Sequence, residues 1–283
     1  MQNIAIITDT DSSLPFNLAA QYNIYQVPMT IHFGEQSYEA VYAVNDADTF
    51  RRIDQEGRLP TTAAPSPGKF IEAFKNSFAT GYEKIICLCV SSEVSGTYNA
   101  ALTARETFPD HDIHIVDSRS LSMGLGYMTL AAAQAAADGA SVNEILIRVE
   151  DIRQRTYLYA ALSTLKYLAM GGRVSNITAG MASILNIKPI LTIRDGKLDM
   201  LERVRTQKKA WERVIELSAI ARGNKSIEQM SILHVNAPKM AQEFTAELRN
   251  RMDCPEQIPL VEITPGLSVH SGSGMVGTVF VIK

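Results

Sequence analysis

The sequence predicts an α/β protein of two domains: an N-terminal three-layer α/β/α domain on a mainly parallel sheet, and a C-terminal α/β domain on a mixed sheet. Three observations lead to this fold class. The chain has 283 residues, a length more typical of two domains than of one. Strand, loop and helix patterns alternate through the first half, which is typical of a parallel sheet covered by helices. After about Thr156 a hairpin pattern appears, so we place the domains at residues 1–156 and 157–283.

The expected strands of the first domain are short and apolar. Ile85 to Val90 is a continuous apolar run, as expected for a strand buried on both faces of a parallel sheet. Pro28 interrupts another strand and indicates an edge or an irregularity, because proline cannot donate a hydrogen bond to a neighbouring strand. The expected strands cover residues 3–7, 24–33, 85–90 and 114–117.

The expected helices of the first domain have recognisable ends. Pro15 and Pro67 stand in first turns, where a missing N–H costs nothing. Gly139 stands where a helix should stop, and Ser141 is placed to cap the next helix. The segment from Tyr98 is rich in alanine, the strongest helix former. The expected helices cover residues 14–22, 50–56, 67–78, 98–108, 124–137 and 142–155.

The second domain mixes a hairpin with helices, which implies a mixed sheet. Asp195-Gly196 is a strong hairpin-turn signal between two apolar segments. The helix expected at residues 208–222 has an amphipathic pattern. The other expected helices cover residues 164–170, 176–185 and 239–252. The expected strands cover residues 158–163, 188–194, 197–205, 230–235, 260–263 and 277–282.

Composition narrows the class of protein. A net charge of −3 argues against a general nucleic-acid binder. The sequence shows no export signal and no apolar run of about 20 residues, so we expect a cytoplasmic protein. Cys87 and Cys89 should point to one face of a buried strand, and zinc-ligand spacing is absent, so we expect no metal site.

Candidate binding residues gather in loops rich in serine, threonine and glycine. These loops cover residues 60–65, 91–97 and 268–274, and the last one contains His270. The loop at 91–97 stands between an apolar strand and a helix, where open α/β sheets bind ligands. A helix start offers unpaired N–H groups to an anion, although Ser95 and Thr97 could instead simply cap the helix, as such residues commonly do. Gly171-Gly172-Arg173 places a guanidinium on flexible backbone.

Several enzymatic alternatives use the same residues. Asp9-Thr10-Asp11 resembles the D-x-D of phosphatases of the haloacid dehalogenase type, but the acidic pair for magnesium is missing downstream. We therefore expect Asp9 and Asp11 to cap the helix at Pro15 and to bond adjoining loops. A serine hydrolase would use Ser95 and His270 with an aspartate such as Asp9 or Asp117. The G-x-S-x-G motif is absent, yet distant residues can build a triad, so this alternative stays open. No strand is followed by the G-x-G-x-x-G of dinucleotide sites.

Seven motifs follow one another in a fixed order and together span almost the whole chain. They are TDTDSSLP, PTTAAPSPGKF, SSEVSGTYNAA, DSRSLSMGLGYM, LKYLAMGGRVS, LNIKPILTIRDGKL and SVHSGSGMVG. Each motif is unspecific, but the ordered set resembles the DegV family, bacterial fatty-acid-binding proteins that present acyl chains to a fatty acid kinase.

The resemblance implies a two-domain fold with one fatty acid between the domains. By the match of motifs, Thr62, Ser95 and His270 would hold the carboxylate, and Gly96 could add a backbone N–H. Thr61 is adjacent to Thr62 and could take its place. Arg173 matches the arginine beside the head group that is associated with the kinase.

Two motifs depart from the family pattern. Ala63-Ala64 stand where the family commonly has a serine and a glutamine, and Ser273 stands where it often has a proline. These changes bear on the fine geometry of the head-group site.

An acyl chain also needs an apolar tunnel, because burial of its methylenes supplies the affinity. The candidate tunnel residues are Met123, Met170, Met181, Ile184 and Leu185.

The function that follows is a carrier. It would bury one long-chain fatty acid, present the carboxylate to a separate ATP-dependent fatty acid kinase, and hold the acyl phosphate for an acyltransferase of phospholipid synthesis. The resemblance implies transient contact with a membrane surface, no cofactor beyond the bound fatty acid, and no catalysis by the chain itself. The alternative is a serine hydrolase or esterase that uses Ser95 and His270.

Overall fold

The structure is a computed structural model, and it describes residues 3–171 and 187–283. Within it the chain divides into two compact units. The first contains Met1–Ala43 and Thr62–Gln154, and the second contains Val44–Thr61 and Arg155–Lys283. The change of unit at Arg155 lies close to the expected boundary, but residues 44–61 pack with the second unit and not with the first. The helix expected at 176–185 lies outside the described residues.

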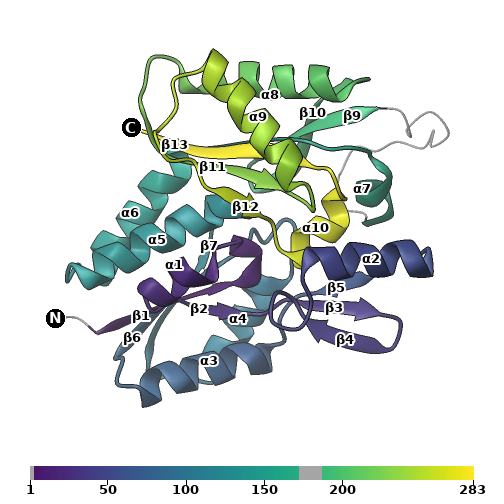
Figure 1. The fold of residues 1–283 in the computed structure, drawn as a ribbon. Coiled ribbons are helices and arrows are strands. Elements are labelled where there is room, and N and C mark those ends of the chain that lie inside the picture. The colour runs from purple at the N-terminus through teal and green to yellow at the C-terminus, as the bar shows by residue number, and fades with distance from the viewer. Residues whose placement is uncertain (1–2, 172–186) are drawn as a thin grey trace. The chain divides into compact units, whose positions relative to one another are not determined.

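The first unit is built on a parallel sheet (Figure 1). Its strands are arranged in the order β2 (Tyr25–Val27), β1 (Ile4–Asp9), β6 (Lys84–Cys89) and β7 (Asp112–Asp117). Each neighbouring pair runs parallel, so the mainly parallel sheet is confirmed.

Helices cover both faces of this sheet and give the three expected layers. Helices α3 (Pro67–Ala79) and α4 (Thr97–Arg105) pack their apolar side chains on one face, over Ile7, Cys87 and Cys89. Helix α5 (Met123–Ala137) contacts β1 and β6. Two further helices are α1 (Phe16–Gln21) and α6 (Val142–Arg155). Cys87 and Cys89 are fully buried free thiols on one face of β6, as expected.

The segment expected as one strand at 24–33 forms two strands, and the irregularity expected at Pro28 is the point where the chain changes sheets. β2 ends at Val27, and β3 (Thr30–Phe33) joins a small separate sheet. That sheet has the order β4-β3-β5, with β4 at Gln36–Glu39 and β5 at Thr61–Ala63. Pro28 lacks the N–H that a continuing strand would need. The loop expected at 60–65 therefore begins with a short strand.

The second unit is built on a mixed sheet of the order β10-β9-β8-β13-β11-β12. β11 and β12 run parallel, whereas the other neighbouring pairs run antiparallel. Asp195 and Gly196 join β9 to β10, with φ angles of 50° and 80°. Two left-handed residues are the requirement of a type I′ hairpin turn, so the hairpin prediction is confirmed. The strands are β8 (Thr156–Ala161), β9 (Lys188–Arg194), β10 (Lys197–Val204), β11 (Ile227–His234), β12 (Leu260–Glu262) and β13 (Val276–Ile282).

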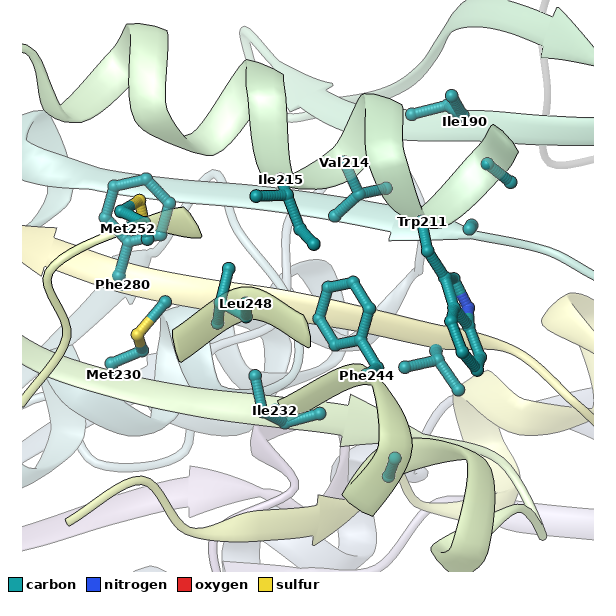
Figure 2. Packing of buried hydrophobic residues seen from close by; sticks show 14 of the residues in the cluster. Ile190, Trp211, Val214, Ile215, Met230, Ile232, Phe244, Leu248, Met252 and Phe280 are labelled. Carbon is teal, nitrogen blue, oxygen red and sulfur yellow. The ribbon is translucent and has the colours of Figure 1, made fainter. Parts of the chain in front are cut away.

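Helices α8 (Gln207–Arg222) and α9 (Pro238–Arg251) supply the apolar core of the second unit. Figure 2 shows Trp211 and Phe244 from these helices beside Ile232 on the sheet. The Trp211 and Phe244 rings meet edge to face, with centroids 5.8 Å apart. The amphipathic helix expected at 208–222 is confirmed within one residue.

Helix α10 (Pro265–Ser271) replaces the loop expected at 268–274. Pro265 stands in its first turn, and Gly272 follows its end with a φ of 82°. The glycines and serines favoured a loop, but none of them interrupts the helix between Leu267 and Ser271. His270 therefore lies in the last turn of a helix.

Helices α2 (Asp46–Glu56) and α7 (Lys166–Gly171) pack with α10. Asn45 caps α2 by accepting a hydrogen bond from the Asp48 N–H, so the helix begins four residues before the expected start at Phe50. The Phe50 ring contacts Tyr167 of α7 edge to face, at 6.2 Å between centroids. These contacts are the reason residues 44–61 belong to the second unit. Among residues 3–171 and 187–283, no helix is long and apolar enough to cross a membrane.

Candidate ligand site

The 91–97 loop follows β6, and nearly all of its backbone N–H groups already have hydrogen-bond acceptors. The N–H groups from Val90 to Ser95 are hydrogen-bonded to acceptors of the first unit. The Thr97 N–H also has an acceptor, the Ser95 hydroxyl, at 3.4 Å. The Gly96 N–H has no acceptor among the described residues, and Gly96 is exposed. An uncommitted, exposed N–H at the start of α4 can donate to an anion.

Ser95 places a hydroxyl beside this free N–H. Its Oγ lies 2.8 Å from the Thr97 Oγ1, and Thr97 Oγ1 lies 3.6 Å from the sulfur of Met29. Thr97 is buried, whereas Ser95 is partly exposed. A hydroxyl hydrogen rotates freely, so Ser95 can turn its proton from Thr97 to a ligand. The Ser95 hydroxyl also accepts from the Thr97 N–H, as a weak helix cap would. Ser95 can therefore cap the helix and still donate its proton to a ligand.

The loop after β5 lies against the same place. A Cβ built on Gly96 would come within 3.9 Å of the Ala64 Cβ, so two of the loops singled out in the sequence adjoin within the first unit. Thr62 is partly buried on β5, and Thr61 is exposed. The structure thus brings Thr62, Ser95 and Gly96 into one region.

His270 belongs to the second unit, where α7 packs against α10. A Cβ built on Gly171 would lie 2.4 Å from the His270 Nδ1, so the backbone at the end of α7 touches the imidazole. A Cβ built on Gly272 would lie 2.2 Å from the Tyr167 ring. A methyl group at either position would therefore have to displace the facing ring, His270 or Tyr167. Gly171 directly precedes Gly172 and Arg173, which lie outside the described residues.

A buried carboxyl holds α10 in place. The Ser268 Oγ donates to the Asp46 Oδ1 at 2.5 Å, and the Asp46 Oδ2 is buried without a partner among the described residues. Burial raises the pKa of Asp46 from 3.8 to about 8, against a smaller lowering by the Ser268 hydrogen bond. Asp46 is therefore largely neutral at pH 7. The sequence does not reveal this residue, because an aspartate at a helix start is ordinary and Ser268 is 222 residues away.

Asp9 bonds the start of an adjoining loop, as expected, but it caps a different helix from the expected one. Its side chain accepts from the Asp11 N–H at 2.9 Å and from the Val90 N–H at 2.7 Å. It caps the short 3₁₀ helix Thr10–Ser12 and not the helix near Pro15, which has no side-chain cap. Burial raises the pKa of Asp9 to about 7, against smaller lowering by the backbone hydrogen bonds. Across residues 3–171 and 187–283, no group of His, Cys, Asp or Glu side chains is arranged to hold a metal ion.

The candidate tunnel residues have different surroundings. Met123 is buried at the start of α5, with its sulfur 3.0 Å from a Cβ built on Gly126. The Met170 side chain is 58% exposed at the end of α7. Met181, Ile184 and Leu185 lie outside the described residues.

Comparison with known proteins places the whole chain in one family. A family model described as an uncharacterised protein of the DegV family matches residues 3–283. The DegV domain-containing protein BH3627 of Halalkalibacterium halodurans is 31% identical over 283 residues and is covered over 100% of both chains. A DegV domain-containing protein of Caldanaerobacter subterraneus, TTE1491, is 32% identical over 280 residues, 99% of both chains.

Solved structures agree on the fold. A fatty-acid-binding DegV family protein from Thermus thermophilus matches with a TM-score of 0.92 at 24% identity, over 99% of this chain and 100% of that one. DegV from Bacillus subtilis, described as a fatty acid binding protein, matches with a TM-score of 0.85 at 25% identity over 100% of both chains. The family model and the curated relatives each span essentially the full sequence, and the chain therefore belongs to the DegV family.

Proposed function

We propose that the protein binds one long-chain fatty acid and holds its carboxylate with neutral hydrogen-bond donors. The observation that carries this proposal is the pair formed by the Ser95 hydroxyl and the Gly96 N–H at the start of α4, which has no acceptor in the described part of the chain. A carboxylate taken out of water needs such donors to offset its lost hydration. Membership of the DegV family, and the description of the B. subtilis relative as a fatty acid binding protein, support the choice of ligand.

Further head-group contacts follow from the family resemblance. Thr62, or its neighbour Thr61, would donate a second hydroxyl from the β5 loop. His270 would add an imidazole donor, and Arg173 would act beside the head group when a kinase engages it. The acyl chain supplies most of the affinity, at about 0.8 kcal/mol for each buried methylene. Met123 is the buried candidate for its lining.

The finer proposal is a cytoplasmic carrier without catalysis of its own. It presents the carboxylate to a separate ATP-dependent fatty acid kinase and keeps the acyl phosphate for an acyltransferase at the membrane surface. The ATP and magnesium belong to the kinase. The hydrolase alternative requires a base at the Ser95 hydroxyl, whereas in the first unit Ser95 Oγ is paired with another hydroxyl, that of Thr97. This pairing favours a binding role.

Native mass spectrometry of the purified protein, with and without added oleate or palmitate, tests the proposal. We expect one fatty acid per chain, and its length and unsaturation give the preference. A protein that takes up neither acid would contradict the binding function. Rapid turnover of an acyl ester that Ser95→Ala abolishes would instead establish the hydrolase.

Replacement of Ser95 by alanine should weaken oleate binding about 10- to 100-fold, the range for losing a hydrogen bond to a charged group. Titration calorimetry measures the change. Oleyl alcohol, which has no carboxylate, should show a much smaller loss. The Ser77→Ala variant is the matched control, because the Ser77 hydroxyl donates to the Ala73 carbonyl within α3. An equal loss for the alcohol and the acid would mean that Ser95 does not contact the carboxylate.

Replacement of Gly171 by alanine should displace the His270 ring, because the added methyl would lie 2.4 Å from Nδ1 and 3.2 Å from Cε1. Oleate affinity should fall about tenfold, the equivalent of about one lost hydrogen bond. In a His270→Ala background the same change should have little further effect, because the clash is gone. Equal losses in both backgrounds would show that Gly171 acts independently of His270.

A further inference from the structure

The 91–97 loop begins between two aspartate side chains. β6 lies between β1 and β7, and the neighbouring strands end in Asp9 and Asp117. Cys89, the last residue of β6, is in register with Asp117, while Thr8 is in register with Leu88. Asp9 and Asp117 therefore flank the point where β6 becomes the loop that carries Ser95.

Asp117 ties this loop to the loop that follows β7. Its Oδ2 accepts from the Ser92 hydroxyl at 2.6 Å, and its Oδ1 accepts from the Ser92 N–H at 3.1 Å. The same Oδ1 accepts from the Arg119 N–H at 3.0 Å. Arg119 in turn donates through Nη1 to the Glu93 carboxylate at 3.1 Å. Two consecutive loop residues, Ser92 and Glu93, are thus held from the β7 side.

The position of Ser95 depends on these anchors. The Val94 and Ser95 N–H groups both donate to the Ser91 carbonyl, so residues 91–95 form a compact turn. The Ser91 N–H is itself bonded to the Ser120 carbonyl at 2.9 Å. Loss of the Asp117 bonds would release Ser92 in the middle of this turn, so the Ser95 hydroxyl and the Gly96 N–H would be held less firmly. Within the described residues, the Ser95 hydroxyl and the Gly96 N–H make no direct hydrogen bond to the loop after β7. Only the turn at 91–95 connects them to that loop.

We propose that Asp117 is a positioning residue of the fatty acid site: through Ser92 it fixes the turn that aims Ser95 and Gly96 at the carboxylate. Asp117 touches no ligand atom in this role. The inference rests on the proposed function for its ligand but on the observed hydrogen bonds for its geometry. Asp9 acts on the other side of β6 through Val90 but is fully buried, so its replacement would disturb the core. The Asp117 side chain is 18% exposed, which makes it the better residue to test.

A double-mutant cycle tests the proposal in the full chain. The variants are Asp117→Ala, Ser95→Ala and the double variant, titrated with oleate and with oleyl alcohol. Asp117→Ala should weaken oleate binding about tenfold and leave oleyl alcohol within about threefold. In the Ser95→Ala background the loss from Asp117→Ala should shrink to a few-fold, because residues that act as a unit are non-additive. Additive losses, or equal losses for the two ligands, would overturn the positioning role.

A ligand-free measurement separates this inference from the proposed function. In Asp117→Ala, amide hydrogen exchange of residues 92–97 should accelerate at least tenfold, while exchange in the second unit stays unchanged. Unchanged exchange in 92–97 would contradict the inference even if oleate binds. Asp112→Ala is the matched control, because Asp112 begins the same strand and pairs with Lys84 and His114 at the opposite end. Failure of the wild-type protein to bind oleate would sink the proposed function and leave the exchange result to decide the role of Asp117 in the loop.

Discussion

Replacement of Phe244 by alanine should lower the free energy of unfolding of the second unit by about 3–5 kcal/mol, the usual cost of a large buried aromatic. Phe244 is fully buried in α9 and contacts the edge of Trp211. Its removal loses the transfer free energy of the ring and leaves a cavity between two helices and a sheet, which cannot collapse freely. Because the chain has a single tryptophan, Trp211 fluorescence during urea unfolding reports on this unit.

Ile220 provides the control for this prediction. It lies on α8 of the same unit, but its side chain is 73% exposed. Ile220→Ala should change the free energy of unfolding by no more than about 0.5 kcal/mol, as is usual for surface positions. A Phe244→Ala variant as stable as Ile220→Ala would mean that the helices close over the cavity, or that this cluster is not the core that holds the unit together.

Elements with a local signal could be predicted from the sequence, and those fixed by distant contacts could not. The hairpin at Asp195-Gly196 is encoded by the two residues that must adopt positive φ. The amphipathic pattern of α8 likewise predicts the helix from its own residues, because the apolar side chains recur at helical spacing. In contrast, residues 44–61 look like a continuation of the first domain. Their place in the second unit depends on contacts with α7 and α10, which are made by residues more than 100 positions later.

The candidate site shows the same division. Residue type and flanking pattern singled out Ser95 and the small-residue loops, because open α/β sheets bind ligands where a strand is followed by a helix. The pattern could not show that the Gly96 N–H lacks an acceptor among the described residues, because this depends on how the loop folds against its neighbours. In the sequence, Asp117 ends a strand and is one candidate for a triad aspartate; its bonds to Ser92 join residues 25 positions apart, so no local pattern predicts them. Helix α10 was missed because glycine and serine lower helix propensity locally, while packing against α7 and α2 supplies the missing stability.

The buried carboxyl of Asp46 should make the second unit less stable as the pH rises. Its pKa in the folded chain is about 8, raised mainly by burial, whereas in the unfolded chain it ionises near 3.8. Between these pH values the folded state therefore binds more protons than the unfolded state, and stability falls with increasing pH. The contribution of the neutral carboxyl is complete below about pH 4 and is lost as the pH passes about 8.

Asp46→Asn removes this ionisation, so it should flatten the pH dependence. Between pH 5 and pH 8 the free energy of unfolding of the wild-type protein should fall by about 2–4 kcal/mol more than that of the variant, since each pH unit in this interval costs up to about 1.4 kcal/mol. Asparagine keeps an oxygen for the Ser268 hydroxyl, so α10 retains its anchor. Urea unfolding followed by Trp211 fluorescence at a series of pH values measures the difference.

The difference in unfolding free energy between the wild-type protein and Asp46→Asn separates the ionisation of Asp46 from that of other titrating groups. His234 lies in the same unit with a pKa lowered by burial, but it contributes equally to both proteins and cancels in the difference. Asp48→Asn is the control, because Asp48 lies in the same helical turn with a side chain that is 46% exposed and paired with Arg51. It should follow the wild-type curve. If Asp46→Asn also ran parallel to the wild type, Asp46 would have to be ionised in the folded chain, and the Ser268 hydroxyl would then be bonded to a buried charge and not to a neutral acid.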